Sequence, residues 1–257
     1  MKVQNLLPVN KIAEYVDRIL VIENNQVTTP FILPLYANGV PNLLFKSVKG
    51  KLGNCNANYL TLFGQTVFPE TLTLPEDFIL IAYFFKPFSL ITLFGTAAPE
   101  LTNKPIDLDL LYPQKTVALQ ERLLNADTVE GMLALLDDFI FDLITRSKNK
   151  CPLVKYASDQ IANNPSKESL VLVQKDLHIT ERTFQRMFEK NIGIAPGLYR
   201  RICQFNAAFV QLNTRNFQKL SDIAFHNGYA DQSHYIRVFK EFTNITPKDY
   251  LNFGRRP

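Results

Sequence analysis

Hydrophobic and polar positions change their spacing along the 257-residue chain. Up to about residue 112, short apolar runs are broken by Pro34 and by the Asn38-Gly39 pair, a pattern typical of strands joined by turns. From residue 114 to about residue 148, leucines and other apolar residues recur at helical spacing instead. The pattern predicts a β-rich N-terminal part that is followed by two helices.

A segment near the C-terminus occurs twice. The two copies align without a gap at an offset of 51 positions: TERTFQRMFEKNIGIAPGLY at 180–199 and DQSHYIRVFKEFTNITPKDY at 231–250. Each copy opens on a helix-capping residue, Thr180 or Asp231, and closes on a residue that tolerates the left-handed helix stop, Gly193 or Asn244. Apolar residues inside each copy follow the spacing of a helix with one buried stripe.

The opposite face of each predicted helix carries side chains that can read DNA. Arg can form two hydrogen bonds to guanine, Gln can pair with adenine, and an exposed Ile can meet the thymine methyl group. The candidates for base contacts are Arg182, Gln185, Arg186, Gln232, Ser233, His234, Ile236 and Arg237, and those for phosphate contacts are Lys190 and Lys240.

Each candidate also has a structural interpretation. A solvated face is the usual place of helix arginines, but the recurrence of Arg186 as Arg237 one repeat later favours recognition. For Gln185, Gln232 and Ser233, surface polarity or capping is an equal alternative. His234 is also compatible with a partly buried position in the helix.

A helix ahead of each copy would complete a helix-turn-helix unit. Before the second copy, Ile223 and Ala224 share an apolar stripe and Gly228 ends the helix. Before the first copy, the same offset sets Leu172 and Val173 opposite these two residues. Val173 would then replace a small residue, and no turn glycine is present, so the first unit is expected to fit the pattern less closely.

These segments together resemble the DNA-binding region of AraC/XylS-type bacterial transcription regulators. The resemblance covers residues 152–257 and includes LSDIAFHNGYADQSH before the second copy and PGLYRRICQFNAAFVQLN between the copies. It implies an all-α domain of two helix-turn-helix units joined by a long helix, with recognition helices near residues 180–191 and 231–243. The sequence departs from the family pattern at Ala195, where a polar cap usually precedes the proline.

The first half resembles the sensor regions of the same family more weakly, through segments such as ILPLYANGVPNLLF and LFGQTVFPE. This resemblance implies an α+β chain: a cupin-like β-barrel at 1–112 that binds a small effector, helices at 113–148 that pair two subunits, and then the helical domain. Residues 147–152 are expected to form the linker. RNA polymerase is the further partner that the family implies.

Two alternatives stay open in this half. An aromatic set either lines an effector pocket or forms ordinary core: Phe63, Phe68, Tyr83, Phe84, Phe85, Phe88 and Phe94. The apolar stripe on residues 132–144 either packs on its own barrel or forms a dimer seam.

Charge divides the chain in the same place as the pattern. Residues 150–257 hold 16 Lys and Arg against 9 Asp and Glu, whereas residues 1–149 hold 12 against 15. A basic domain favours binding to phosphate, and an acidic one is not expected to lie along a duplex.

Candidate enzyme chemistry is sparse. The histidines, His178, His226 and His234, all lie in the C-terminal half, whereas metal-dependent cupins bind their ion with clustered histidines. Cys55 and the other two cysteines are scattered and odd in number, which fits neither a disulfide framework nor a zinc site. We therefore expect no cofactor, no metal and no enzyme.

The longest apolar run, FILIAYFF at 78–85, is far shorter than the roughly 18 residues of a membrane span, and the N-terminus shows no signal-peptide pattern. We expect a cytoplasmic, sequence-specific transcription regulator that binds double-stranded DNA and no membrane. The alternative is a ligand- or partner-binding protein that uses the helical domain for protein contacts. The operator, the effector, the direction of regulation and the oligomeric state stay undetermined by the sequence.

Overall fold

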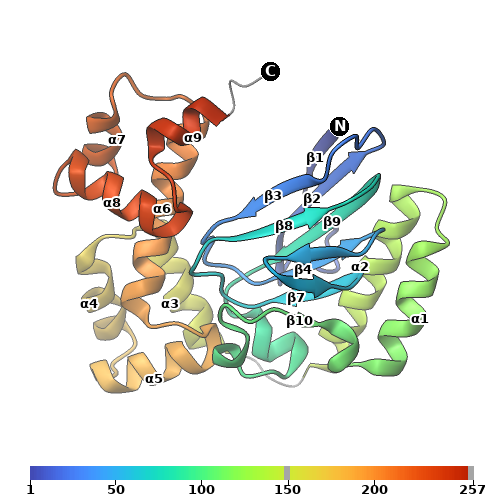
Figure 1. Ribbon diagram of the computed structural model, residues 1–257. Coiled ribbons are helices and arrows are strands. Elements are labelled where there is room, and N and C mark those ends of the chain that lie inside the picture. The colour runs from blue at the N-terminus through green and yellow to red at the C-terminus, as the bar shows by residue number, and fades with distance from the viewer. Residues whose placement is uncertain (148–150, 254–257) are drawn as a thin grey trace.

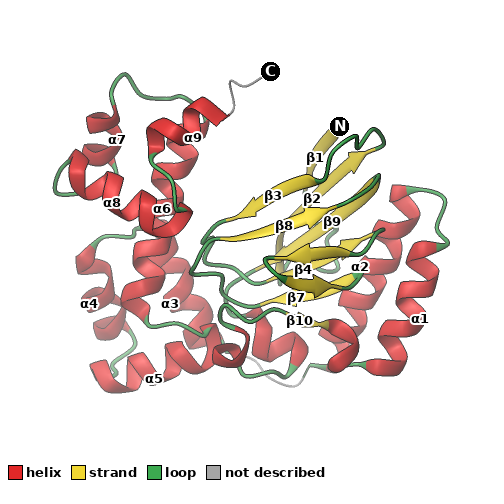
Figure 2. Ribbon diagram, viewed as in Figure 1, coloured by secondary structure: helices red, strands yellow, loops and turns green. Residues whose placement is uncertain are grey.

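The computed structural model describes residues 1–147 and 151–253, so residues 148–150 of the expected linker and residues 254–257 lie outside the described part. A β-rich half and a helical half lie beside each other (Figure 1; Figure 2). The following strands make up a six-stranded antiparallel sheet, in spatial order: β1 (Lys2–Leu6), β2 (Val16–Asn24), β9 (Phe78–Phe85), β4 (Asn42–Lys46), β7 (Leu60–Phe63) and β10 (Ile106–Asp107). A four-stranded sheet has the order β3 (Phe31–Leu35), β8 (Glu70–Leu74), β5 (Gly50–Leu52) and β6 (Cys55–Ala57).

The expected closed barrel is wrong, because these two sheets remain open. Within the described residues β1 pairs only with β2, and β10 pairs only with β7. A barrel requires the first and last strands of a sheet to join, and the two-residue β10 presents too little backbone to close the circle. The α+β class is confirmed, with two sheets in place of the barrel.

Strand β9 is buried on both of its faces. Successive side chains of a strand point to opposite faces, so Leu80 and Ala82 pack with Leu72 and Leu74 of β8 between the two sheets. The alternate residue Tyr83 belongs to the larger core on the helix-covered face. Double burial explains why β9 reads as an uninterrupted apolar run.

Helices α1 (Pro113–Leu124) and α2 (Val129–Arg146) cover the outer face of the six-stranded sheet (Figure 1). The apolar stripe of α2 is buried in the same core as the sheet: Met132, Leu136, Phe139, Ile140 and Leu143. The hydroxyl of Tyr83 donates a 2.8 Å hydrogen bond to the carboxylate of Asp137 on α2. The stripe therefore packs on its own sheet, which answers the alternative between core and dimer seam.

Three short helical turns connect the sheets to these helices: the π-helix η1 (Leu90–Phe94) and the 3-10 turns η2 (Ala98–Leu101) and η3 (Leu108–Leu110). The helical half contains α3 (Pro152–Asn163), α4 (Lys167–Asp176), α5 (Glu181–Ile192), α6 (Pro196–Asn213), α7 (Leu220–His226), α8 (Gln232–Thr243) and α9 (Pro247–Phe253).

The long helix α6 joins the two helix-turn-helix units. Near its start, the ring of Tyr199 lies 5.3 Å from that of Phe188 on α5. Farther along, the ring of Phe205 lies 5.7 Å from Phe239 and 5.2 Å from Phe242 on α8. The aromatic contacts of α6 therefore set the positions of both units relative to one helix. Within the described residues, no helix has the length and apolar character needed to cross a membrane.

Lys46 of β4 is fully buried. Its ammonium group donates hydrogen bonds to the Asn58 carbonyl oxygen and, at 3.3 Å, to the Thr61 hydroxyl. Burial lowers the pKa of Lys46 from 10.5 to about 8, and the nearby carboxylate of Asp107 offsets only part of this effect. The folded chain therefore releases this proton at a lower pH than the unfolded chain.

The free energy of unfolding is expected to rise with pH between about 8 and 10 in the wild type, relative to a Lys46→Met variant. In this window the unfolded chain still holds the lysine proton, so raising the pH favours the folded state by on the order of 2–3 kcal/mol. Urea unfolding of both proteins across this pH range measures the difference. If the free energy of unfolding changed with pH in the same way in both proteins, Lys46 would not be the cause of the pH dependence.

Candidate nucleic-acid interface

Helices α5 and α8 begin and end as the repeat predicts. The Thr180 hydroxyl accepts a 3.3 Å hydrogen bond from the Thr183 amide, and the Asp231 carboxylate accepts one of 2.7 Å from the His234 amide. At the other ends, Gly193 has φ of 97° and Asn244 has φ of 62°, both in the left-handed region. The caps and stops inferred from the repeat are confirmed.

Most of the candidate DNA-reading residues lie on the solvent-facing sides of these helices. The exposed ones are Arg182, Gln185, Arg186 and Lys190 on α5 and Gln232, Ser233, Arg237 and Lys240 on α8. The opposite sides are buried through aromatic residues, including Phe184 and Phe188 of α5 and Tyr235 and Phe239 of α8. Each helix therefore presents a polar face that its own packing does not use.

Two candidates are only half-buried. The sequence analysis expected Ile236 to be exposed, so that it could meet a thymine methyl group. In the structure its side chain is only partly exposed. The His234 ring packs edge-on against Tyr229, and its Nδ1 lies 3.4 Å from the Ala230 amide, which donates to it. His234 is therefore partly buried, the alternative that the sequence left open, and it also contacts the turn that leads into α8.

The first unit fits the pattern better than the sequence alignment indicated. Just after α4 the Ile179 amide donates back to the Gln174 carbonyl, and just after α7 the Tyr229 amide donates back to the Ala224 carbonyl. The offset between these equivalent bonds is 50, not 51, because Ala230 adds one residue to the second turn. Gln174 therefore occupies the position of Ala224, and the interpretation of Val173 as a bulky replacement is wrong.

The same register identifies the equivalent of the turn glycine in the first unit. His178 has φ of 52° and Gly228 has φ of 69°, so both residues adopt the left-handed conformation at the turn. A non-glycine residue accepts this conformation at some cost, and histidine is among the residues that do so more often. The first unit therefore has a histidine where the second has a glycine, and the turn has the same conformation in both.

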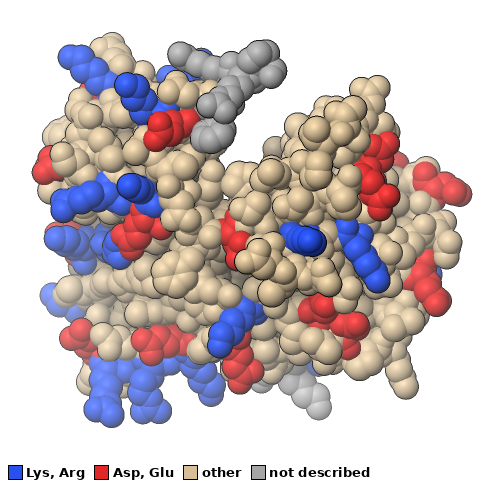
Figure 3. Space-filling view, viewed as in Figure 1, with Lys and Arg blue, Asp and Glu red and all other residues tan. Residues whose placement is uncertain are grey.

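Basic side chains gather on the edge of the helical half that α5 forms (Figure 3). In contrast, Lys and Arg are more dispersed among acidic groups over the β-rich half in the same view. This distribution agrees with the charge division of the sequence and concentrates a positive potential near one recognition face.

Contacts between the β-rich half and the helical half include two hydrogen bonds. At the end of α5, the Thr102 hydroxyl donates a 2.9 Å hydrogen bond to the Gly193 carbonyl. On α6, the Asn206 amide donates a 2.8 Å hydrogen bond to the Asn38 carbonyl. The first recognition helix and the connecting helix are therefore both attached to the β-rich half.

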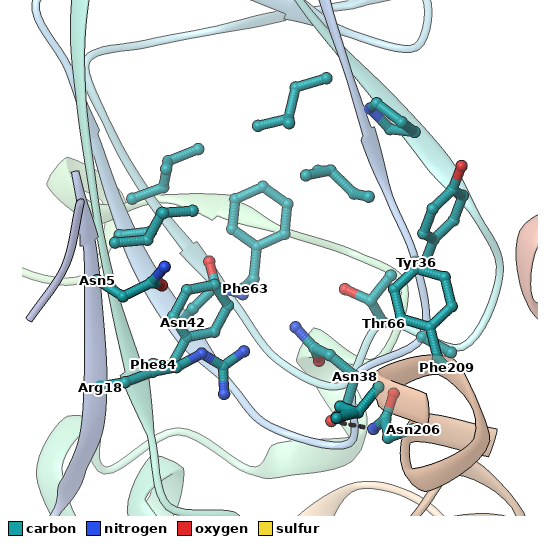
Figure 4. Close-up of a pocket in the computed structure, with 18 of the residues that line it drawn as sticks. Asn5, Arg18, Tyr36, Asn38, Asn42, Phe63, Thr66, Phe84, Asn206 and Phe209 are labelled. Atoms are coloured by element: carbon teal, nitrogen blue, oxygen red, sulfur yellow. Dashed lines mark hydrogen bonds between the residues drawn. The ribbon is translucent and has the colours of Figure 1, made fainter. Parts of the chain in front are cut away.

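A cavity of about 730 Å³ lies beside the second of these contacts (Figure 4). Its walls come from both sheets and from α6, including Phe63, Phe84 and Phe209. The guanidinium of Arg18 lies 4.1 Å above the Phe84 ring and 3.4 Å from the Asp17 carboxylate. The cavity thus combines an apolar wall with one cationic group, and both halves of the chain shape it.

The aromatic set identified in the sequence divides between three places. Phe63 and Phe84 line the cavity, and Phe68 is 67% exposed. The other members lie in the core that the helices cover: Tyr83, Phe85, Phe88 and Phe94. Two members of the set therefore line a cavity, and four belong to ordinary core. Within the described residues, no group of three or more His, Cys, Asp or Glu side chains is arranged to hold a metal ion.

Comparison with known proteins agrees with this architecture. Residues 174–252 match the model of a helix-turn-helix domain, and residues 4–107 match that of a domain of unknown function, DUF6597. An uncharacterized HTH-type transcriptional regulator of Haemophilus influenzae is 22% identical over 183 residues, which cover 65% of this chain. The match spans 60% of the length of that relative.

Solved structures of ToxT from Vibrio cholerae share the fold. One at 1.65 Å resolution has a TM-score of 0.50 at 13% identity and covers 98% of both chains. ToxT bound to (E)-4-(8-methylnaphthalen-1-yl)but-3-enoic acid has a TM-score of 0.51 at 13% identity, over 98% of this chain and 99% of that one. A ToxT structure with an unsaturated fatty acid bound has a TM-score of 0.50 at 12% identity, over 90% and 97%.

The two capped helices and their exposed faces lie within residues 174–252, which match the helix-turn-helix domain model. In this chain α6 joins the two helix-turn-helix units, the arrangement that the resemblance to AraC/XylS-type regulators implies.

Proposed function

We propose that the chain binds a two-part site on duplex DNA and thereby controls transcription. Helices α5 and α8 enter successive major-groove segments on one face of the duplex, about 34 Å apart. Arg186 and Arg237 read base edges, and Lys190 and Lys240 hold phosphates. The remaining candidates refine the choice of sequence: Arg182, Gln185, Gln232, Ser233, His234 and Ile236.

One observation carries this proposal: the exposed arginine at the same repeat position of two separately capped helices, Arg186 and Arg237. A solvated surface alone gives no reason for the same residue to recur on the same face. The basic balance of the helical half also disfavours the alternative in which this half serves only protein contacts.

Selection of bound duplexes from a random library tests the proposal directly. The intact chain is expected to enrich a site of two short elements whose centres lie about one helical turn apart. Repeating the selection at two salt concentrations separates sequence preference from phosphate attraction, which weakens with salt. Binding that shows no sequence preference and disappears with salt would support the partner-binding alternative.

A small amphipathic effector in the cavity is the second part of the proposal. Unsaturated-fatty-acid-bound ToxT shares this fold, and the cavity here has an apolar wall with Arg18 beside it. A guanidinium favours carboxylates because it offers several donors in a planar fork. Since Phe209 and Asn206 of α6 also line the cavity, a ligand there would contact the helix that joins the two recognition units.

Oleate is expected to raise the melting temperature of the intact chain. The Arg18→Gln variant is expected to need about a tenfold higher oleate concentration for the same rise. Arg146→Gln serves as the control because Arg146 is an exposed arginine of the same half that does not line the cavity. Differential scanning fluorimetry measures the shifts. Equal responses of the two variants would exclude Arg18 as the anchor.

The domain division at 1–112, 113–148 and 152–257 belongs to the same proposal, as do a second subunit and RNA polymerase as partners. Because the stripe of α2 is buried, pairing of two chains would use outward side chains such as Val117, Leu124 and Phe141, which are 52%, 40% and 41% exposed. Sedimentation of the intact chain with and without its selected duplex distinguishes a monomer from a dimer.

A further inference from the structure

A second cavity of about 720 Å³ lies between the two helix-turn-helix units. The loop between α3 and α4 borders it on one side, and the turn between α7 and α8 borders it on the other. Residues of α6 form its floor, among them Arg200 and Gln204. The exposed arginines of α5 and α8, Arg186 and Arg237, do not line this cavity.

Arg200 is held in place by the loop before α4 directly and by the second unit through Gln204. Its Nη1 donates hydrogen bonds of 2.9 Å to the Pro165 carbonyl and 3.1 Å to the side-chain oxygen of Gln204. The amide of Gln204 in turn donates a 2.8 Å hydrogen bond to the Asn227 carbonyl, next to the turn of the second unit. The guanidinium is therefore fixed before any ligand arrives, which reduces the entropy lost on binding.

Tyr229 also lines this cavity, and its hydroxyl is an unused donor. The residue is 6% exposed, and its buried hydroxyl has no hydrogen-bond partner among the described residues. Burial raises the pKa of Tyr229, against the opposing effect of Arg200 and Arg201, so the hydroxyl keeps its proton. A buried donor without a partner is costly, and a ligand that accepts its proton would remove that cost.

The charge around this hydroxyl favours an anion. Besides Arg200, the cavity is lined by Arg201 and by Lys167 at the first position of α4, and the single carboxylate in its lining is Glu168. Arg201 also forms a 2.5 Å ion pair with Glu241 of α8, so part of its charge is already compensated. The positive end of the α4 helix dipole adds to the attraction.

We propose that this cavity binds a phosphate oxyanion, and specifically a DNA backbone phosphate that lies between the two recognition helices. This inference deepens the proposed function and rests on it for the source of the phosphate. Two helices in successive major grooves leave a stretch of backbone between them, and the cavity lies between the units that carry those helices. Tyr229 and Arg200 donate to the phosphate oxygens.

The test compares Tyr229→Phe with Tyr235→Phe. Tyr235 also has a buried hydroxyl without a partner, but it does not line the cavity, so this second variant controls for the loss of such a group. Fluorescence anisotropy of the intact proteins measures their affinity for the selected duplex and for a scrambled one. Tyr229→Phe is expected to weaken both affinities about tenfold and to keep their ratio, because phosphate contacts carry no sequence information. Tyr235→Phe is expected to bind like the wild type.

Two further measurements identify the source of the phosphate. A duplex with a neutral methylphosphonate at the central position should bind the wild type about tenfold more weakly and should show no added loss with Tyr229→Phe. Thermal melting with increasing inorganic phosphate and no DNA tests for binding of a free anion instead. If the cavity binds free phosphate, the wild type is stabilised and Tyr229→Phe is not. The proposal is overturned if the two Tyr variants behave alike in both measurements. Failure of the proposed function would appear separately, as equal affinity of the wild type for the selected and scrambled duplexes.

Discussion

Replacing Arg186 and Arg237 together by alanine is expected to lower affinity for the selected duplex by about 2–6 kcal/mol. Each arginine that pairs with a guanine edge contributes about 1–3 kcal/mol of discrimination, and the two lie on separate helices, so their effects should nearly add. Affinity for scrambled DNA should fall much less. Anisotropy titrations at one fixed salt concentration measure both affinities and therefore their ratio.

Lys190→Ala with Lys240→Ala is the matched control, because these residues lie on the same two helices and are also exposed. Loss of phosphate contacts should weaken binding to both duplexes alike and reduce the slope of log affinity against log salt by about 2. If the arginine pair behaved like the lysine pair, with equal losses on both duplexes, base reading by Arg186 and Arg237 would be excluded.

The helical half could be predicted in detail because its signals are local. Thr180, Asp231, Gly193 and Asn244 each determine a helix end through groups within four residues along the chain. An error there concerned the extra residue Ala230, since a repeat aligned at a fixed offset cannot detect an insertion in the turn.

The β-rich half was harder to predict because its strand pairs are distant in sequence. Alternation along β9 determines which side chains share a face, but the pairing of β9 with β2 and β4 depends on the packing of the whole core. Whether the sheets close depends on strand lengths and edges, such as the two-residue β10, which have no local signature.

The same alternation contains a signal that the sequence interpretation missed. In FILIAYFF, Phe84 shares its face with Leu80 and Ala82, which also line the cavity between the sheets and α6, while Tyr83 and Phe85 point to the other face. Treating the aromatic residues as one set hid this division. The basic cavity between the two units was missed for a different reason, because Arg200 and Tyr229 come together only through the folding of α6 against both units.

Gly193→Asn is expected to destabilise the intact chain by about 2–4 kcal/mol, because the end of α5 is packed tightly against the β-rich half. A Cβ atom at Gly193 would lie 2.6 Å from the Thr102 hydroxyl and 2.7 Å from the Ala98 carbonyl oxygen, closer than such atoms approach without a shift of backbone. The hydrogen bond from Thr102 to the Gly193 carbonyl would be disturbed as well. Thermal and urea unfolding measure the loss.

The repeat supplies the control for this substitution. Asparagine already occupies the equivalent position of the second unit, where Asn244 adopts φ of 62°, so a left-handed helix end as such accepts asparagine, although Gly193 itself has φ of 97°. The reciprocal change, Asn244→Gly, should alter stability by no more than about 1 kcal/mol. A large loss for Gly193→Asn alone would establish that the β-rich half presses on the end of the first recognition helix. An effector bound in the β-rich half could then change the orientation of α5 directly through that contact. If both substitutions had equally small effects, α6 would remain the connection between the cavity and DNA.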